Sequence, residues 1–140
     1  MKILFVCEGN INRSQMAEAF MRADAPEIDI ASAGVYADHA GECLKDVPEN
    51  PVDLMKDAGF DIGNARITQL TPQMIEGADM VILTGPVPRA PLPQYLADSP
   101  KLEAWDVPDP GYEQISQEDA RDLIQKKVRG LAARLHNKEE

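Results

Sequence analysis

Short apolar segments alternate with segments of helical character along this chain, and this alternation restricts the fold more than any other feature. The apolar segments are residues 2–6, 28–33, 79–84 and 101–105. Strands that alternate with helices form a parallel sheet with helices on both faces. A length of 140 residues fits one domain. The sequence therefore predicts an α/β fold, a single three-layer domain over residues 1–140 with a four-stranded parallel sheet.

Capping residues and prolines mark where the helices begin. Ser14 starts the first predicted helix, and Pro51 suits the first turn of the second. Thr71 is the expected N-cap of the third, and Ser116 starts the last. Residues 85–93 contain four prolines. We therefore predict that this segment is stiff and irregular.

The charge and the cysteine content of the chain restrict its partners and its compartment. A formal net charge of −10 repels nucleic acid and anionic lipid. The apolar start, residues 1–7, is too short for a secretory signal or a membrane span. The two cysteines make no disulfide framework, and reduced thiols are typical of the cytoplasm. We therefore expect a cytoplasmic protein, a monomer or weak dimer, that binds neither nucleic acid nor membranes.

The segment from Cys7 to Ser14, CEGNINRS, joins the first predicted strand to the first predicted helix. A loop at a helix start turns backbone amides inward, and these amides with the helix dipole bind an oxyanion. The same field favours the thiolate of Cys7, which is its nucleophilic form. Arg13 offers a planar fork that matches two phosphate oxygens. We predict a phosphate-binding loop of Glu8, Gly9, Asn10, Ile11, Asn12, Arg13 and Ser14.

Several residues of this loop have more specific expected roles. Gly9 allows the backbone conformations that a wrapped loop needs, and Asn10 tolerates positive φ. Ser14 has two alternative uses, as a hydroxyl donor to the thiolate or as a helix cap. A cysteine at a strand end is often only a small core residue. We interpret Cys7 and Arg13 as functional because the segment that contains them, with five residues between the cysteine and the arginine, joins a predicted strand to a predicted helix.

Two aspartates compete for the role of general acid. Cleavage of a phosphate ester requires a proton for the leaving oxygen, and a carboxylic acid above the phosphate supplies it. Asp109 lies in a proline-bounded loop that should share one edge of the sheet with Cys7. Asp106 directly follows the fourth strand and has a simpler use in ending it. The predicted catalytic residues are therefore Cys7, Arg13 and Asp109.

The segment VCEGNINRSQMAEA resembles the signature of the low-molecular-weight protein tyrosine phosphatases and of the arsenate reductases that share their fold. Residues 32–34 (SAG) are similar to the end of the family's second strand, and residues 106–110 (DVPDP) to its general-acid loop. The resemblance covers nearly the whole chain. It implies the strand order 2-1-3-4, a phosphocysteine intermediate, and catalysis without a metal or another cofactor.

The chain departs from the family pattern at several positions. Asn12 stands where many members have a second cysteine, which leaves Cys43 as the other thiol. Asn64 stands where a histidine usually supports the loop asparagine, and an amide can do the same. Family phosphotyrosine phosphatases often have two tyrosines after the acid, whereas this chain has Tyr112 alone. Tyr36 is the candidate for the opposite aromatic wall of the substrate rim.

We expect a phosphomonoester hydrolase, similar to a protein tyrosine phosphatase, that acts on a phosphorylated protein or a small phosphate ester. Phosphotyrosine, phosphoarginine and small phosphate esters remain open as substrates. One alternative is arsenate reduction, which needs further thiols, and residues 82–89 contain no cysteine. The other alternative is a non-catalytic module that binds phosphate or a phosphoprotein. Such a module needs neither a nucleophile nor an acid.

Overall fold

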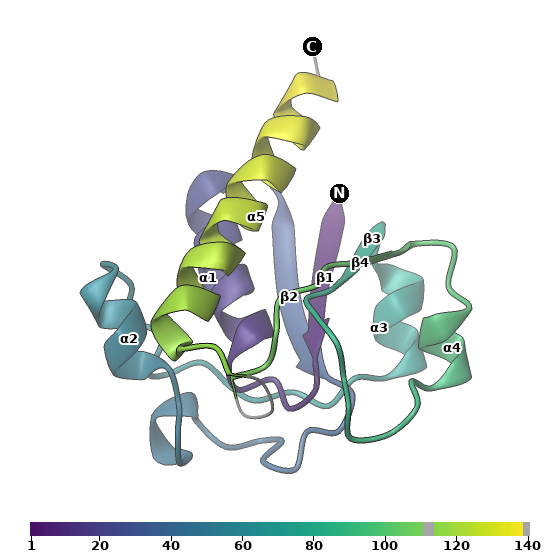
Figure 1. Ribbon diagram of the computed structural model, residues 1–140. Helices are drawn as coiled ribbons and strands as arrows, with labels where there is room; N and C mark the ends of the chain where they lie inside the picture. Colours follow the sequence, from purple (N-terminus) through teal and green to yellow (C-terminus); the bar gives the residue numbers. More distant parts are fainter. Residues whose placement is uncertain (111–113, 139–140) are drawn as a thin grey trace.

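The computed structural model describes residues 1–110 and 114–138, and a four-stranded sheet lies at its centre (Figure 1). Neighbouring strands run parallel, in the order β2-β1-β3-β4. The predicted sheet and its order 2-1-3-4 are therefore confirmed. The strands are β1 Lys2–Cys7, β2 Asp29–Gly34, β3 Met80–Leu83 and β4 Leu102–Ala104.

Helices cover both faces of this sheet, as the alternating pattern predicts. Helices α1 and α5 pack against one face, whereas α3 and α4 cover the other (Figure 1). The bounds are α1 Arg13–Asp24, the short 3₁₀ helix η1 Leu44–Asp46, α2 Val52–Asp57, α3 Pro72–Gly77, α4 Gln94–Ala97 and α5 Gln117–Lys138.

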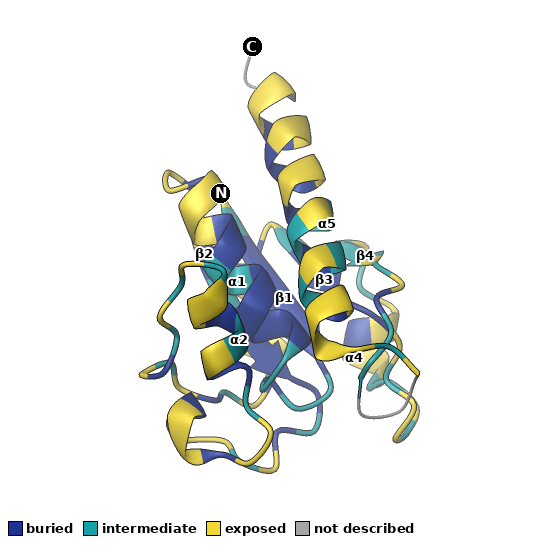
Figure 2. Cartoon of the chain, turned by 60° about the vertical axis from the view of Figure 1, so that its left-hand side comes forward, coloured by how far each residue is buried: buried dark blue, intermediate teal, exposed yellow. Residues whose placement is uncertain are grey.

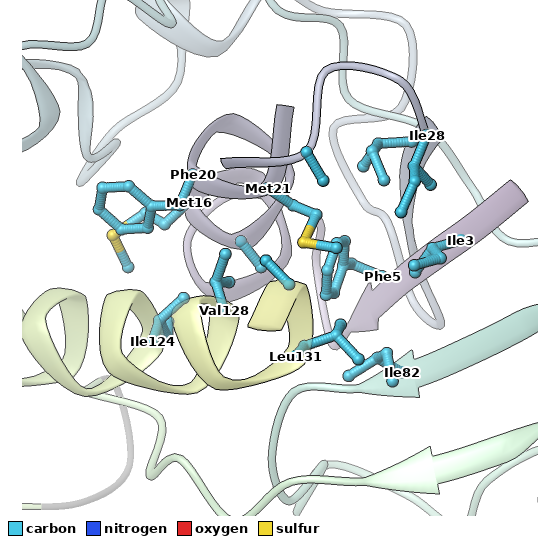
Figure 3. Packing of buried hydrophobic residues seen from close by; sticks show 14 of the residues in the cluster. Ile3, Phe5, Met16, Phe20, Met21, Ile28, Ile82, Ile124, Val128 and Leu131 are labelled. Carbon is cyan, nitrogen blue, oxygen red and sulfur yellow. The ribbon is translucent and has the colours of Figure 1, made fainter. Parts of the chain in front are cut away.

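Strand β1 divides the core into two layers because its side chains alternate between the faces of the sheet. Ile3 and Phe5 pack with α1 and α5 (Figure 3), whereas Leu4 and Val6 pack on the side of α3 and α4. Figure 2 shows the strand buried and the outer sides of the helices exposed. Burying each large side chain contributes roughly 1.5–3 kcal/mol. This burial fixes β1, and with it the start of the loop that follows.

Helix α4 is an element that the sequence does not predict. It has four residues and begins directly after Pro93, next to the predicted irregular segment 85–93. Leu96 is its buried residue. One buried leucine beside prolines and polar residues gives no helical periodicity, so this short helix has no signature in the sequence.

The loop after β2, residues 35–50, has a small apolar cluster of its own. Ala37, Leu44 and Val47 are buried in it together with residues from the following segments. Ile11, from the loop after β1, packs against the same cluster. The long loop is therefore fixed beside the loop that follows Cys7, at the edge of the sheet where the parallel strands end.

Helix α5 is amphipathic along its 22 residues. Ile124, Val128, Leu131 and Leu135 are buried against the core, as the sequence pattern predicts. The residues between them are mostly charged or polar. Neither α5 nor any other helix within residues 1–110 and 114–138 combines the length and the apolar composition needed to cross a bilayer.

Candidate active site

The loop between β1 and α1 brings Cys7 to the start of a helix. Cys7 is the last residue of β1 and is 3% exposed, and α1 begins at Arg13. Asn10 has a φ of 57°, which fulfils the expectation that it adopts the left-handed region. Gly9 is not among the described residues with positive φ, so the turn depends on Asn10 instead.

Four consecutive backbone amides of this loop, those of residues 9–12, donate to no acceptor in the described part of the chain. Asn12 is the N-cap of α1 and makes no side-chain capping bond, so the helix start is also open. Backbone N–H groups inside proteins are nearly always paired. A run of unpaired amides at a helix N-terminus is therefore a site prepared for an anion.

Arg13 is a buried guanidinium that two distant loops hold in place. Its side chain is 1% exposed. Its Nη1 donates to the carbonyl oxygens of Pro86 at 3.0 Å and Val107 at 3.1 Å, and its Nη2 to Oδ2 of Asp109 at 3.2 Å. The loops after β3 and β4 therefore orient the arginine that the first loop supplies.

Cys7, Arg13 and Asp109 line one cavity of about 700 Å³. Asp109, which is 96 residues from Arg13 in the sequence, is thus brought to the same opening as the loop that carries Cys7 and Arg13. Four other members of the predicted phosphate-binding loop also line it, namely Glu8, Gly9, Ile11 and Asn12. The remaining lining residues are Pro48 and Glu49 in the loop after β2, Pro110 and Ile115 before α5, and Gln117 at the start of α5.

The structure decides between the two alternative uses of Ser14. Its Oγ lies 2.9 Å from Sγ of Cys7, and it accepts a hydrogen bond from Nδ2 of Asn10 at 2.8 Å. Either the hydroxyl of Ser14 or the thiol of Cys7 can donate in this contact, and the N-cap of α1 is Asn12, so Ser14 contacts the sulfur and does not cap the helix. A hydroxyl donor stabilises a thiolate relative to a thiol.

Asn10 is held by a buried network of hydrogen bonds. Its Nδ2 also donates to Oγ of Ser32 at 2.9 Å, and its Oδ1 accepts from the amide of Thr68 at 2.9 Å. Ser32 in turn donates to Glu18 at 2.6 Å. These contacts hold Asn10, the residue of the loop with a left-handed conformation. Side chains and backbone outside the loop therefore stabilise the conformation of the loop.

The amide that supports Asn10 comes from a different residue than the sequence suggests. Nε2 of Gln15 donates to Oδ1 of Asn10 at 3.2 Å. Asn64, the residue expected in this role, is exposed and accepts from Nζ of Lys45 at 3.2 Å. That expectation was wrong because Gln15 reaches Asn10 from within α1, through a contact that only the folded helix creates.

Asp109 and Asp106 have very different surroundings. The side chain of Asp109 is 18% exposed, lines the cavity and contacts Arg13. The side chain of Asp106 is 89% exposed and pairs with Nζ of Lys127 at 3.3 Å. Of these two aspartates, Asp109 lines the cavity and Asp106 does not.

Two glycines with no role assigned from the sequence make close contacts behind the site. A Cβ at Gly34 would lie 2.7 Å from the backbone nitrogen of Asn10. A Cβ at Gly85 would overlap the carbonyl oxygen of Val107 and lie 2.5 Å from Nη1 of Arg13. Both glycines let backbone approach the site closely. A glycine just after a buried parallel strand is the sequence signal that could have identified Gly85.

Tyr36 does not lie where the sequence suggests. It is not among the cavity-lining residues, so it forms no wall of the candidate site. Its hydroxyl donates to the carbonyl of Pro91 at 2.6 Å, and the guanidinium of Arg89 lies 5.4 Å from its ring centroid. The ring of Tyr36 also packs against the apolar cluster on the α3 and α4 side of the sheet. Tyr36 therefore holds the proline-rich segment against the loop after β2. Tyr112 lies outside the described residues.

The same segment carries an ion pair that perturbs a carboxyl group. Arg89 donates to both carboxylate oxygens of Asp38, at 2.7 Å and 3.3 Å. This hydrogen bonding holds the pKa of Asp38 below its ordinary value. The loop after β2 and the proline-rich segment are therefore joined electrostatically as well as through Tyr36.

Cys43 is a free, half-buried thiol in the loop after β2. It pairs through an isolated antiparallel bridge with Arg66, and it is not among the cavity-lining residues. The backbone pairing with Arg66 is what fixes the position of Cys43. Within the described residues, no three His, Cys, Asp or Glu side chains gather as a metal site would require.

The fold and the site together define a class of enzyme. A thiol at the end of a central parallel strand faces open amides, and a buried arginine and a carboxyl group line the same cavity. This is the arrangement of enzymes that attack a tetrahedral oxyanion with a cysteine. The model of the family described as "Low molecular weight phosphotyrosine protein phosphatase" matches residues 2–140. The chain belongs to this family of phosphatases.

Individual relatives agree with this assignment. The chain is 32% identical over 143 residues to a probable low molecular weight protein-tyrosine-phosphatase, EpsP, of Ralstonia solanacearum, with 95% of this chain and 94% of the relative covered. It is 30% identical over 141 residues to an arsenate reductase of Bacillus licheniformis, covering 93% and 94%. Among solved structures it is similar to an arginine phosphatase, YwlE, with a phosphorylated active site serine, at 27% identity and a TM-score of 0.76, covering 97% and 96%.

Proposed function

We propose that this protein hydrolyses phosphate monoesters by way of a phosphocysteine formed at Cys7. The observation that carries the proposal is that Cys7, Arg13 and Asp109 line one cavity beside four uncommitted backbone amides. Each group supplies what one step of the reaction needs: a nucleophile, an anion clamp and a proton. Membership of a phosphatase family supports the same reaction.

In the first step Sγ of Cys7 attacks phosphorus. The S–P bond forms, and the P–O bond to the leaving group breaks. Asp109 donates its proton to the leaving oxygen, which is otherwise a poor leaving group. Arg13 and the amides of residues 9–12 stabilise the charge that spreads over the equatorial oxygens in the transition state.

In the second step water removes the phosphoryl group from sulfur. Asp109, now a carboxylate, takes a proton from the attacking water. The new P–O bond forms as the S–P bond breaks, and inorganic phosphate leaves. The thiolate that departs receives the hydrogen bond of Ser14, whose Oγ lies 2.9 Å from the sulfur.

A phosphorylated protein or a small phosphate ester is the proposed substrate. Similar proteins are named protein-tyrosine-phosphatase and protein-arginine-phosphatase, and these names support a phosphorylated protein as the substrate. We further propose that the protein works in the cytoplasm as a monomer or weak dimer. Two cysteines without a disulfide support the cytoplasm, where a catalytic thiol stays reduced.

Arsenate reduction is the rival reaction because relatives with this name match the chain. After arsenate is attacked, further thiols must carry away the electrons. Besides Cys7 the chain has one cysteine, Cys43, and it does not line the cavity. The single thiol in the site therefore favours hydrolysis, which needs no electron donor.

Hydrolysis of p-nitrophenyl phosphate tests the proposal with a matched pair of variants. Cys7→Ser should abolish turnover, because an alcohol at that position is a much weaker nucleophile than a thiolate. Cys43→Ser removes the other thiol and should retain turnover. Equal loss in both variants, or none in either, would contradict the role of Cys7. A wild-type protein that binds phosphate without turnover would be a binding module instead, and thiol-dependent loss of arsenate would establish the reductase.

A further inference from the structure

Asn12 lies in the catalytic loop, and its side chain makes no hydrogen bond within the described part of the chain. It precedes Arg13 and lines the cavity over Cys7. As the N-cap of α1, an asparagine ordinarily accepts a hydrogen bond from a backbone amide of the first turn. Asn12 makes no such bond. The proposed reaction uses the backbone amide of Asn12, but it leaves the carboxamide without a purpose.

The carboxamide oxygen of Asn12 has an unusual environment. Among the buried side-chain nitrogen and oxygen atoms of the described residues, Oδ1 of Asn12 is the atom without a hydrogen-bond partner. A buried polar atom in this state costs stability, so its presence calls for an explanation. The carboxamide of Asn10, two residues earlier, has partners at both ends. Hydrogen bonding within the fold therefore explains the side chain of Asn10 but not that of Asn12.

The nitrogen of the same carboxamide is the accessible atom. Nδ2 donates to no described residue, and it is not among the buried atoms without a partner, so solvent reaches it. Asn12 is half-buried and lines the cavity, which is where a ligand can meet this nitrogen. A carboxamide nitrogen carries two N–H donors and no acceptor. The accessible end of Asn12 is therefore a donor, and the buried end is the acceptor.

The groups beside Asn12 are donors as well. The backbone amides of residues 9–12 donate to no described acceptor. Arg13 has five N–H donors and gives three of them to Pro86, Val107 and Asp109, which leaves two for a ligand. One of the open amides is that of Asn12 itself, so an oxyanion bound there has its oxygens next to the carboxamide. An N–H donor is favourable at this place, and a carbonyl oxygen is not.

We infer that Nδ2 of Asn12 is a further phosphate-binding donor, which contacts a non-bridging oxygen of the phosphoryl group that Cys7 accepts. This inference rests on the proposed function and adds a binding residue to it. The non-bridging oxygens stay on phosphorus throughout the reaction, so the contact is present in the substrate complex, the transition state and the phosphocysteine. The buried Oδ1 is the cost to the fold of presenting this donor.

Asn12→Ala separates a binding role from a structural one. It should lower kcat/KM for p-nitrophenyl phosphate about 10- to 100-fold, the usual range for a hydrogen bond to a charged group. The inhibition constant of inorganic phosphate should rise in parallel, because the product meets the same donor. The free energy of unfolding should not fall, since the substitution removes no hydrogen bond of the described fold. Loss of activity together with loss of stability would mean that Asn12 supports the loop, which overturns the inference.

Asn12→Asp keeps the shape of the side chain but replaces its donor with an acceptor. Aspartate is as good an N-cap residue as asparagine, so the variant should fold. Its carboxylate repels the phosphoryl group, so kcat/KM should fall further than in Asn12→Ala. An Asn12→Asp protein as active as the wild type would overturn the inference.

Asn64→Ala is the matched control for Asn12→Ala, because it removes the same carboxamide elsewhere. Asn64 is exposed and is not among the residues that line the cavity over Cys7. The control should leave kcat/KM and the inhibition by phosphate at their wild-type values. If Asn64→Ala lowered kcat/KM as much as Asn12→Ala, the effect would not come from a contact in the cavity, and the inference would fail.

The leaving group gives a kinetic signature of where Nδ2 binds. A donor to a non-bridging oxygen acts alike on good and poor leaving groups. Asn12→Ala should therefore lose the same factor in kcat/KM with an alkyl phosphate as with p-nitrophenyl phosphate, whereas loss of a general acid affects the alkyl phosphate more. A clearly larger loss with the alkyl phosphate would place Asn12 at the leaving oxygen and contradict the inference.

Thermal unfolding with added inorganic phosphate distinguishes failure of this inference from failure of the proposed function. Phosphate should raise the Tm of the wild type, and it should raise that of Asn12→Ala by less, because a ligand of the native state stabilises it according to its affinity. If the wild type hydrolyses p-nitrophenyl phosphate and Asn12→Ala matches it in kcat/KM and phosphate inhibition, the inference is overturned and the proposed function stands. If the wild type binds phosphate without turnover and Asn12→Ala weakens that binding, the proposed function is overturned and the phosphate contact stands.

Discussion

At the scale of single residues, Asp109 is distinguished by its position and not by its chemistry. Asp106 carries the same carboxyl group but is 89% exposed and pairs with Lys127. Asp109 is 18% exposed and contacts the guanidinium of Arg13 at 3.2 Å. Because an acid must reach the leaving oxygen, these positions favour the proposal that Asp109, and not Asp106, is the general acid.

Replacement of Asp109 should therefore depend on the leaving group. Asp109→Ala should lower kcat for an alkyl phosphate about 10²- to 10⁴-fold, the usual contribution of a general acid. The loss for p-nitrophenyl phosphate should be clearly smaller, because nitrophenolate leaves with little protonation. Steady-state kinetics with both substrates measure the difference, and Asp106→Ala serves as the control. Equal losses for the two substrates would move the acid role elsewhere.

Gly85 provides a test of how Arg13 is oriented. A Cβ at this position would overlap the carbonyl of Val107 and crowd Nη1 of Arg13. Overpacking of this kind costs about 1–3 kcal/mol. Gly85→Ala should therefore lower both the free energy of unfolding and the phosphatase activity, which denaturant titration and kinetics measure.

Gly130 is the matched control for this substitution. It lies within α5, and a Cβ there would meet nothing within 4 Å. Gly130→Ala should stabilise the protein by about 0.5–1 kcal/mol through helix propensity and leave activity unchanged. If Gly85→Ala proved as harmless as Gly130→Ala, the close packing around Arg13 would not matter for function.

At the scale of elements, the proline-rich segment before α4 is tied to the loop after β2. Arg89 binds the carboxylate of Asp38 through two hydrogen bonds, and Tyr36 donates to the carbonyl of Pro91. The hydrogen bonding from Arg89 lowers the pKa of Asp38. Because this pKa is lower in the folded than in the unfolded chain, the pair stabilises the fold above the unfolded pKa.

Asp38→Asn should therefore destabilise the protein in a pH-dependent way. The difference in unfolding free energy from the wild type should be present near neutral pH. It should disappear as pH falls through the folded pKa of Asp38, because the wild-type carboxylate is then protonated as well. Denaturant titrations at several pH values measure this difference. A difference that stays constant down to the most acidic condition would mean that the ion pair contributes nothing.

The elements differ in how far the sequence predicts them. Strand β1 and the loop after it are predictable because a continuous apolar run is followed at once by CEGNINRS. Helix α4 is not, since its four residues bury one leucine. Gln15 and Tyr36 show the same limit. Gln15 donates to nearby Asn10 but also to the carbonyl of the distant residue Arg66, and Tyr36 donates to the carbonyl of the distant residue Pro91. Contacts between distant segments leave no local pattern in the sequence.

At the scale of the whole molecule, an acidic protein contains a local site for an anion. The net charge is −10, yet the bottom of the cavity has open amides and the buried guanidinium of Arg13. The parallel sheet makes this possible, because the loops after its strands meet at one edge (Figure 1). Local backbone geometry, and not overall charge, sets the field at Cys7.

The central claim is that phosphorus is transferred to the sulfur of Cys7, and mass spectrometry of the rapidly quenched enzyme tests it most directly. During turnover of p-nitrophenyl phosphate, the peptide that contains Cys7 should gain the mass of one phosphoryl group, and Asp109→Ala should increase the fraction modified by slowing hydrolysis of the intermediate. Continued turnover with the phosphoryl group on another residue, or with none on Cys7 in either protein, would contradict the account.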